Sequence, residues 1–388
     1  MPRRADRHRR RHRCVLVHVA GGHRPARARG HGGRGGRRRG IRGGDRRRRR
    51  HPSRHARGAV AARGGGAALV RVLVAGTARS GSTWVSNVLG HSAETRHVYE
   101  PDGPMSDVLG AITAARLGEF PVLTPDARSY WYRLVWDLGF AGGWPWDRVE
   151  SARAAGRRLV RIPPSMRDAV VAALAETTSR LRRRPRHVVV KSVNSVFSLD
   201  WIVKRYTPKV LVLRRNPLNV VSSWVVLNLG TERRIGDHPL VDELYVRPLG
   251  LVAPNGASSA VRIAAWNVGL LTRALKQASA AHPEWIVASH DDLCVDPATR
   301  FRELTTRLGL AWTAAMEDYL LRSDDPDFTA HHGSAAVHPN AVTATTTESR
   351  RLQQGTQYQR RLSAEQTAEA RAVLDGFDLG DWGPGPPG

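Results

Sequence analysis

The chain has 388 residues, 41% of them hydrophobic, so it can bury a substantial core. Its formal charge of +27 would suit a nucleic-acid-binding protein, but most of the excess lies in residues 1–65, which hold 23 arginines and two aspartates. Two cysteines, Cys14 and Cys294, exclude a disulfide framework, and no apolar run reaches bilayer length, so we expect a cytoplasmic protein without a membrane span.

Residues 1–65 repeat arginine, glycine, histidine and alanine without the periodicity of a helix or strand. Such a segment cannot bury enough surface to offset the entropy of ordering, so we predict that it is disordered. It is either an arginine-rich arm for nucleic acid or anionic membrane, or an artefact of a GC-rich gene translated from too far upstream. We expect no specific nucleic-acid partner and assign the folded domain to residues 66–388.

The folded domain begins with a strand, a tight loop and a helix. Residues 69–75 form a short β-branched run that predicts a buried strand, and residues 84–89 have apolar groups at helical spacing. The sequence GTARSGST, residues 76–83, lies between them. It has the frame of a Walker A phosphate-binding loop, except that Ser82 replaces the expected lysine.

The missing lysine disfavours an ATP-hydrolysing loop, because nucleotide triphosphatases use that lysine to reach the β- and γ-phosphates. The cation comes earlier in this loop, from Arg79, and hydroxyls come from Ser80, Ser82 and Thr83. Together with the N–H groups of a helix N-terminus, these side chains suit a single phosphate-like group. The alternative is a glycine- and serine-rich turn that only joins a strand to a helix.

The later elements alternate between strands and helices. Strand-like runs occur at 187–190, 209–213 and 285–288, and helical patterns occur at 168–181, 218–229, 260–281 and 298–308. This alternation predicts an α/β, P-loop-like fold of three layers, with a mostly parallel central sheet and helices on both faces.

The stretch 101–186 is too long for a simple crossover, and we expect a helical, aromatic-rich insertion. Its rings either build a satellite core, which is the commoner use of such residues, or stack on a sugar or lipid acceptor. The rings are Tyr130, Trp131, Tyr132, Trp136, Phe140, Trp144 and Trp146.

A second anion-binding pattern follows the strand at 209–213. Arg215-Asn216-Pro217 turns into a helix, and Ser223 lies eight residues after Arg215, about two helical turns further on. Both side chains could reach one anion. The alternative is a surface arginine and a serine in the interior of a helix.

The two patterns together resemble the PAPS-dependent sulfotransferases, which use 3′-phosphoadenosine-5′-phosphosulfate (PAPS) as donor. Their 5′-phosphosulfate loop is similar to residues 77–84, and their 3′-phosphate motif, an Arg-(Asn/Asp)-Pro turn with a serine eight positions after the arginine, is similar to residues 215–223. Weaker similarity at Glu100-Pro101, 290–293 and 361–365 extends the resemblance over the folded domain.

Two departures place the chain nearer the carbohydrate-directed and bacterial branch of that family than its cytosolic small-molecule branch. The cytosolic branch has a histidine base shortly after a strand lysine, whereas Lys191 is followed by Ser-Val-Asn. Its Arg-Lys-Gly near the C-terminus is also absent, and Arg350-Arg351 is the nearest substitute.

The resemblance implies transfer of a sulfuryl group from PAPS to a hydroxyl of an acceptor, a carbohydrate or glycolipid, without a metal. Arg79 and then Lys191 are the cations expected at the transferring group, and Arg215 and Ser223 would hold the 3′-phosphate. The residues expected around the 5′-phosphate are Arg79, Ser80, Gly81, Ser82, Thr83 and Trp84.

Glu100 is the expected general base, because it would return near the mouth of the loop; the alternative is a surface glutamate before a proline. His290, Asp291 and Asp292 are rivals for this role, although the matching acidic pair of the family is structural. The neighbouring histidines His331 and His332 look like solvated loop residues. Two other functions stay open: a P-loop kinase using ATP, and a nucleic-acid-binding protein acting through the arginine-rich arm.

Overall fold

The computed structural model describes residues 69–144, 163–182, 185–230, 235, 237–323 and 354–385, all within the unit Gly65–Gly388. The arginine-rich segment 1–65, Trp146, the pair at 331–332 and the pair at 350–351 lie outside the described residues, so the predictions for them stay predictions. The domain limits at 66–388 likewise stay a prediction.

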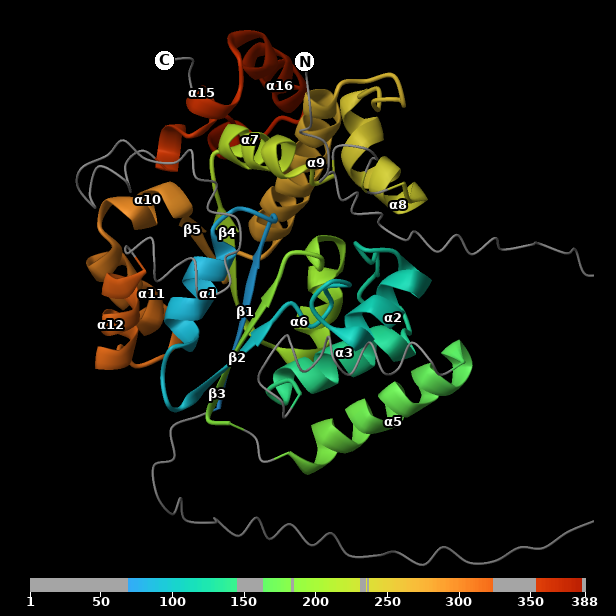
Figure 1. Cartoon of the computed structure of the whole chain (residues 1–388), viewed down its shortest axis with the longest axis vertical. Coiled ribbons are helices and arrows are strands. Elements are labelled where there is room, and N and C mark those ends of the chain that lie inside the picture. Colours follow the sequence, from blue (N-terminus) through green and yellow to red (C-terminus); the bar gives the residue numbers. More distant parts are fainter. Residues whose placement is uncertain are drawn as a thin grey trace, which may run out of the picture. The chain divides into compact units, whose positions relative to one another are not determined.

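In the described part of the chain, five parallel strands form the central sheet, in the order β2-β3-β1-β4-β5 (Figure 1). They are β1 (Val70–Gly76), β2 (Thr95–Tyr99), β3 (His187–Ser192), β4 (Lys209–Arg214) and β5 (Ile286–Ser289). The predicted α/β fold with a mostly parallel sheet is confirmed. The sequence did not reveal β2, because this edge strand buries Val98 alone and so lacks an apolar pattern.

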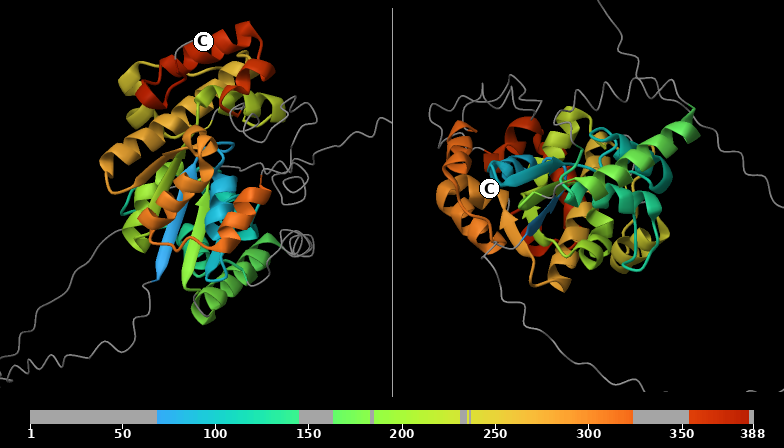
Figure 2. Two further views of the ribbon diagram at one scale, coloured as in Figure 1. Left: turned by 90° about the vertical axis from the view of Figure 1, so that its left-hand side faces the viewer. Right: turned by 90° about the horizontal axis from the view of Figure 1, so that it is seen from below.

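Helices cover both faces of the sheet, as the two views of Figure 2 show. Alternate strand residues point to opposite faces, so Val72, Val74 and Leu211 enter one core while Leu73, Val210 and Val212 enter the other. The first core is closed by α1 (Ser82–Gly90), α10 (His290–Val295), α11 (Pro297–Leu308) and α12 (Ala314–Arg322).

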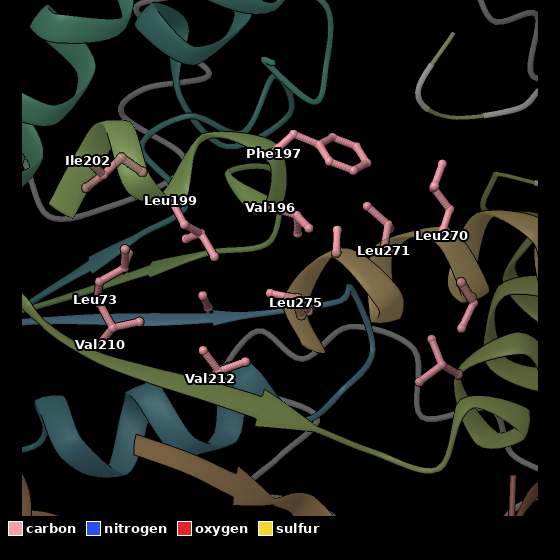
Figure 3. Close-up of a cluster of buried hydrophobic side chains, with 14 of the residues drawn as sticks. Leu73, Val196, Phe197, Leu199, Ile202, Val210, Val212, Leu270, Leu271 and Leu275 are labelled. Carbon is pink, nitrogen blue, oxygen red and sulfur yellow. The ribbon is translucent and has the colours of Figure 1, made fainter. Parts of the chain in front are cut away.

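The second core is larger, and Figure 3 shows part of it, where Leu73, Val210 and Val212 lie with Leu271 and Leu275 of the helix α9 (Ala260–Ala281). The helices of this layer are α2 (Val108–Leu117), α3 (Tyr130–Phe140), α5 (Pro164–Leu181), α6 (Leu199–Tyr206), α7 (Pro217–Leu227), α9 (Ala260–Ala281) and α16 (Ala364–Asp375). Shorter helical segments are η1 (Val196–Ser198), α8 (Pro239–Val241), η2 (Asp242–Val246), η3 (Arg247–Leu249), η4 (Gln354–Thr356), α15 (Tyr358–Arg361) and η5 (Gly380–Trp382).

The described part of the stretch 101–186 contains three helices, α2, α3 and α5. Four of its aromatic side chains, Tyr132, Trp136, Phe140 and Trp144, are buried, and the first three pack ring against ring. These four side chains therefore build a core and are not available to an acceptor.

Candidate active site

The predicted site residues follow the carboxyl ends of neighbouring strands. The loop carrying Arg79 follows β1, Glu100 follows β2, Lys191 is the penultimate residue of β3, and Arg215 follows β4. Because these strands are parallel, their carboxyl ends lie at one edge of the sheet, where open α/β folds bind their ligands. Side chains that are distant in sequence therefore meet there.

The loop between β1 and α1 turns tightly against β4 and α10. Ser80 N donates to Thr77 O at 3.1 Å, and Arg79 and Gly81 adopt φ angles of 74° and 90°. A Cβ at Gly76 would lie 2.9 Å from the carbonyl oxygen of Leu213, and a Cβ at Gly81 would collide with the ring of His290. Both glycines are therefore required by close approach.

The loop has polar groups that make no hydrogen bond to the described residues. Ser80 is fully buried, and its Oγ has no hydrogen-bond partner among the described residues. Gly81 caps α1 without a side chain, so the first N–H groups of the helix receive no side-chain cap from it. An uncapped helix N-terminus beside an unpaired hydroxyl is suited to an anion.

The expectation that Trp84 helps to cradle the 5′-phosphate stays a prediction, and its side chain contacts other elements. Its Nε1 donates to Ser323 Oγ at 2.9 Å, and its ring packs edge-on against Phe301 at a centroid distance of 5.1 Å. The indole is thus directed into the contact between α1 and the α11–α12 pair.

The two predicted anion-binding motifs touch each other directly. Arg79 Nε donates to Ser223 Oγ at 3.0 Å, and Arg215 Nη1 donates to the carbonyl oxygen of Arg79 at 3.0 Å. Hydrogen bonds therefore join segments that are 136 to 144 residues apart in the chain.

Local capping explains the position of Arg215. Pro217 begins α7, Asn216 Oδ1 accepts from Leu218 N at 3.0 Å, and Asp291 Oδ2 accepts from Asn216 N at 3.2 Å. Burial lowers the pKa of Arg215 to about 10, and the Asp291 carboxylate partly offsets this effect. Arg215 therefore stays protonated at neutral pH, although its Nε has no partner among the described residues.

Sequence reasoning gave no role to two residues at this cluster. Gln354 accepts from Arg215 Nη2 through its backbone oxygen at 3.1 Å and through Oε1 at 3.2 Å. Arg361 in α15 lies close to Arg79, and burial together with that like charge lowers the pKa of Arg361. The weak resemblance at 361–365 was the only signal for Arg361, and nothing marked Gln354.

Glu100 and Lys191 form an ion pair at the same edge of the sheet. Ser106 Oγ donates to Glu100 Oε2 at 3.0 Å, while Lys191 Nζ contacts Oε1 and lies 4.6 Å from the centroid of the Tyr99 ring. The backbone of Glu100 has a φ of 40° and donates to Lys191 O at 2.8 Å. With 15% of its side chain exposed, Glu100 is fixed yet reachable, unlike a free surface glutamate.

Two of the rival acid–base residues, His290 and Asp291, have structural positions. His290 is buried against Gly81 and the Trp84 ring, and burial lowers its pKa to about 4. Asp291 caps the Arg-Asn-Pro turn, and the backbone N–H of Asp292 donates to Ser289 Oγ in the first turn of α10. The role of Glu100 as general base stays a prediction.

Asp102 is a fully buried carboxyl group two residues beyond Glu100. Ser192 Oγ donates to its Oδ2 at 2.7 Å, and Oδ1 has no partner among the described residues. Burial raises the pKa of Asp102 to about 7.

We predict that Asp102→Asn stabilises the protein at about pH 8 and has little effect at about pH 3.5, below the unfolded pKa of the carboxyl group. Such a carboxyl group has a higher pKa in the folded protein than in the unfolded chain. It therefore lowers the free energy of unfolding as pH rises from the unfolded pKa towards the folded pKa. At pH values above the folded pKa, the shift from 3.8 to about 7 lowers the free energy of unfolding by on the order of 4 kcal/mol. An uncharged amide avoids this loss. Thermal unfolding at both pH values measures it, and an equal difference in Tm at the two would contradict the prediction.

A pocket of about 230 Å³ lies near the opposite end of β1, where Arg71, Arg133 and Tyr206 line it. Its charged groups largely neutralise one another, since Arg133 pairs with Asp137 at 2.6 Å and approaches Glu176 at 3.8 Å. Because it lies near the opposite end of β1, the pocket is separate from the site built around Arg79.

Among the described residues, no three His, Cys, Asp or Glu side chains are grouped as ligands for a metal ion. No helix in the described ranges is both long and apolar enough to cross a membrane.

Residues 71–314 match the sequence model of the sulfotransferase family, which is more than half of the chain. No curated protein matches at a significant level. Among solved structures, the sulfotransferase domain of the curacin biosynthetic pathway is similar at 14% identity and a TM-score of 0.42, covering 78% of this chain and 96% of that one.

Two further structures are similarly distant. The sulfotransferase domain of the Synechococcus PCC 7002 olefin synthase has 14% identity and a TM-score of 0.40, covering 80% of this chain and 94% of that one. Sulfotransferase STF9 from Mycobacterium avium has 15% identity and a TM-score of 0.36, covering 80% of this chain and 77% of that one. The family assignment therefore rests on the sequence match.

Proposed function

Because this chain belongs to the sulfotransferase family, we propose that it transfers a sulfuryl group from PAPS to a hydroxyl of a carbohydrate or glycolipid. The products are a sulfate ester and 3′,5′-adenosine bisphosphate. The observation that carries the choice of donor is the direct contact between the two anion-binding motifs, through Arg79 to Ser223 and through Arg215 to Arg79. A donor with phosphate-type groups at both its 5′ and 3′ ends needs two such motifs side by side.

Unused polar groups at the site fit this donor. Ser80 Oγ and Arg215 Nε are buried without partners among the described residues, and leaving such groups unpaired is unfavourable. Arg79, Arg215 and Arg361 bring three positive charges together, and burial lowers the pKa of each. A bound phosphate oxygen would relieve both the unpaired donors and the mutual repulsion of the arginines.

When bound, PAPS would supply the activated sulfuryl group. By analogy with phosphoryl transfer, negative charge collects on the bridging and leaving oxygens of a loose transition state, so positioned cations lower the barrier. Ser223 orients the guanidinium group of Arg79, which would neutralise that charge. Lys191 is the second cation, although its ammonium group contacts Glu100 in this structure.

Glu100 would take the proton of the acceptor hydroxyl. The ion pair with Lys191 and the hydrogen bond from Ser106 fix the orientation of the Glu100 carboxyl group. A carboxylate offers about four lone-pair sites, so those two contacts leave room for an acceptor.

The acceptor class rests on the resemblance of Glu100-Pro101 to the carbohydrate-directed branch. The aromatic insertion supports it less, because four of its rings are buried in the core. A cytoplasmic location, expected from the cysteine usage, belongs to the same proposal.

We predict that Glu100→Gln lowers kcat by about 10²- to 10⁴-fold, the usual contribution of a general base. Affinity for 3′,5′-adenosine bisphosphate should stay nearly unchanged, because no proton is transferred on binding. Glu94→Gln is the matched control, since Glu94 pairs with Arg186 at 2.6 Å at the other end of β2. Initial rates at saturating substrate measure the effect, and a kcat equal to that of the control would remove Glu100 from the mechanism.

The donor itself is tested by nucleotide affinity. We expect calorimetry to show that 3′,5′-adenosine bisphosphate binds far more tightly than AMP, because the 3′-phosphate is the group that Arg215 would hold. Equal affinities would contradict the choice of donor. ATP turnover that stops on adding EDTA would favour a P-loop kinase instead.

A further inference from the structure

The backbone at Arg79 adopts a conformation that a non-glycine residue rarely takes. Its φ angle of 74° lies in the left-handed region, which persists in such residues only where the surrounding structure enforces it. The carbonyl oxygens on either side of this φ angle are both held by side chains. Arg215 Nη1 donates to Arg79 O at 3.0 Å, and Trp224 Nε1 donates to Ala78 O at 3.0 Å.

The Trp224 side chain is itself firmly placed. It is 3% exposed, and a Cβ at Gly230 would lie 2.7 Å from its six-membered ring. The chain leaving α7 also returns over this residue, because Leu229 N donates to Trp224 O at 2.8 Å. The indole N–H therefore has little freedom to leave Ala78.

Trp224 directly follows Ser223 in α7, and Ser223 Oγ accepts from Arg79 Nε. Two consecutive residues of one helix thus hold both the main chain before Arg79 and the guanidinium group of Arg79.

We propose that Trp224 is a positioning residue for Arg79: its indole N–H, together with Arg215, sets the left-handed backbone that directs the Arg79 guanidinium towards the transferring group. The inference rests on the proposed function, in which Arg79 stabilises that group. Trp224 itself would not touch the donor or the acceptor.

The test replaces Trp224 with phenylalanine, which keeps an aromatic ring and removes the N–H. We expect kcat to fall about 10- to 100-fold, since displacing a catalytic group by a fraction of an ångström to an ångström costs rates of this order. Affinity for 3′,5′-adenosine bisphosphate should change less than about threefold, because Arg215 and the helix N-terminus remain.

Trp201→Phe is the matched control. Trp201 is 1% exposed, and its Nε1 donates to Ala127 O at 2.8 Å, so this change removes the same kind of bond in α6, away from the phosphate-binding loop. Trp201→Phe should lower Tm by a similar amount and leave kcat unchanged. Equal kcat values for the two variants would overturn the proposal.

A double-mutant cycle with Arg79→Ala shows whether Trp224 acts through Arg79. In the Arg79→Ala background, Trp224→Phe should cause no further loss of kcat, whereas a full additional loss would show an independent effect and refute the proposal.

Hydrogen exchange separates this proposal from the proposed function. The amides of residues 77–81 should exchange faster in Trp224→Phe than in Trp201→Phe, even if the protein transfers no sulfuryl group from PAPS. Unchanged exchange would refute the positioning role of Trp224. Faster exchange in a protein that is inactive with PAPS would refute the proposed sulfuryl transfer and leave the positioning role supported.

Discussion

Replacing Arg79 with alanine should lower kcat for sulfuryl transfer by about 10²- to 10³-fold, the cost of losing one preorganised donor to a developing negative charge. Arg79 supplies the cation of a loop that lacks the Walker lysine, and Ser223 orients its guanidinium group. Affinity for 3′,5′-adenosine bisphosphate should fall much less, since this product lacks the transferred group and the rest of the loop would still hold its 5′-phosphate. Initial rates at saturating PAPS and calorimetry with the product measure the two effects.

Two further variants make the Arg79 result specific. Arg79→Lys keeps the charge but loses the planar guanidinium that contacts Ser223, so we expect an intermediate kcat. Arg302→Ala removes an exposed arginine that pairs with Glu317 at 2.8 Å between α11 and α12, and it should leave kcat unchanged. A kcat for Arg79→Ala within about threefold of the unmodified protein would rule out the assigned role, because one lost donor normally costs far more.

Replacing Arg215 with alanine should abolish the preference for 3′,5′-adenosine bisphosphate over AMP. A hydrogen bond to a charged group contributes about 1.5 to 3 kcal/mol, so affinity for the bisphosphate should fall by roughly 10- to 100-fold or more. AMP should lose little affinity, apart from the effect of freeing the carbonyl oxygen of Arg79. Calorimetry with both nucleotides on both proteins measures the change.

The neighbouring arginine provides the control for Arg215. Arg214 ends β4 and pairs with Asp381 at 2.9 Å, so Arg214→Ala removes the same charge one residue away without touching the phosphate-binding loop. That variant should keep the preference for the bisphosphate. If Arg215→Ala also keeps the preference for the bisphosphate, the 3′-phosphate lies elsewhere. The proposal that Arg215 and Ser223 hold it together is then wrong.

The layers of the fold could be predicted because its buried strands and long helices carry strong periodic signals. The run at 209–213 and the helix at 260–281 lie within one residue of the observed β4 and α9. The edge strand β2 has the sequence Thr-Arg-His-Val-Tyr, with one buried residue, and such a strand cannot be told from a loop by periodicity. The strand order cannot be read from local patterns either.

The site could be predicted in part, for a similar reason. The phosphate-binding loop and the Arg-Asn-Pro turn are local motifs, so the sequence marked Arg79, Arg215 and Ser223 without knowledge of the sheet. The contact of Arg215 with Gln354 depends on how the C-terminal helices return to the sheet, and the pairing of Glu100 with Lys191 depends on the unrecognised strand β2. These contacts join residues that are far apart in the chain, so they produce no local motif in the sequence.

The central claim is that this protein moves a sulfuryl group from PAPS to an acceptor hydroxyl, and transfer of label from sulfur-labelled PAPS tests it most directly. The protein is incubated with labelled PAPS and a panel of carbohydrates and glycolipids, with Arg79→Ala in parallel and EDTA in a further sample. We expect a labelled sulfate ester formed in equal amount with 3′,5′-adenosine bisphosphate, unaffected by EDTA and nearly absent with Arg79→Ala. Label that stays in PAPS or appears only as free sulfate across the whole panel would contradict the claim.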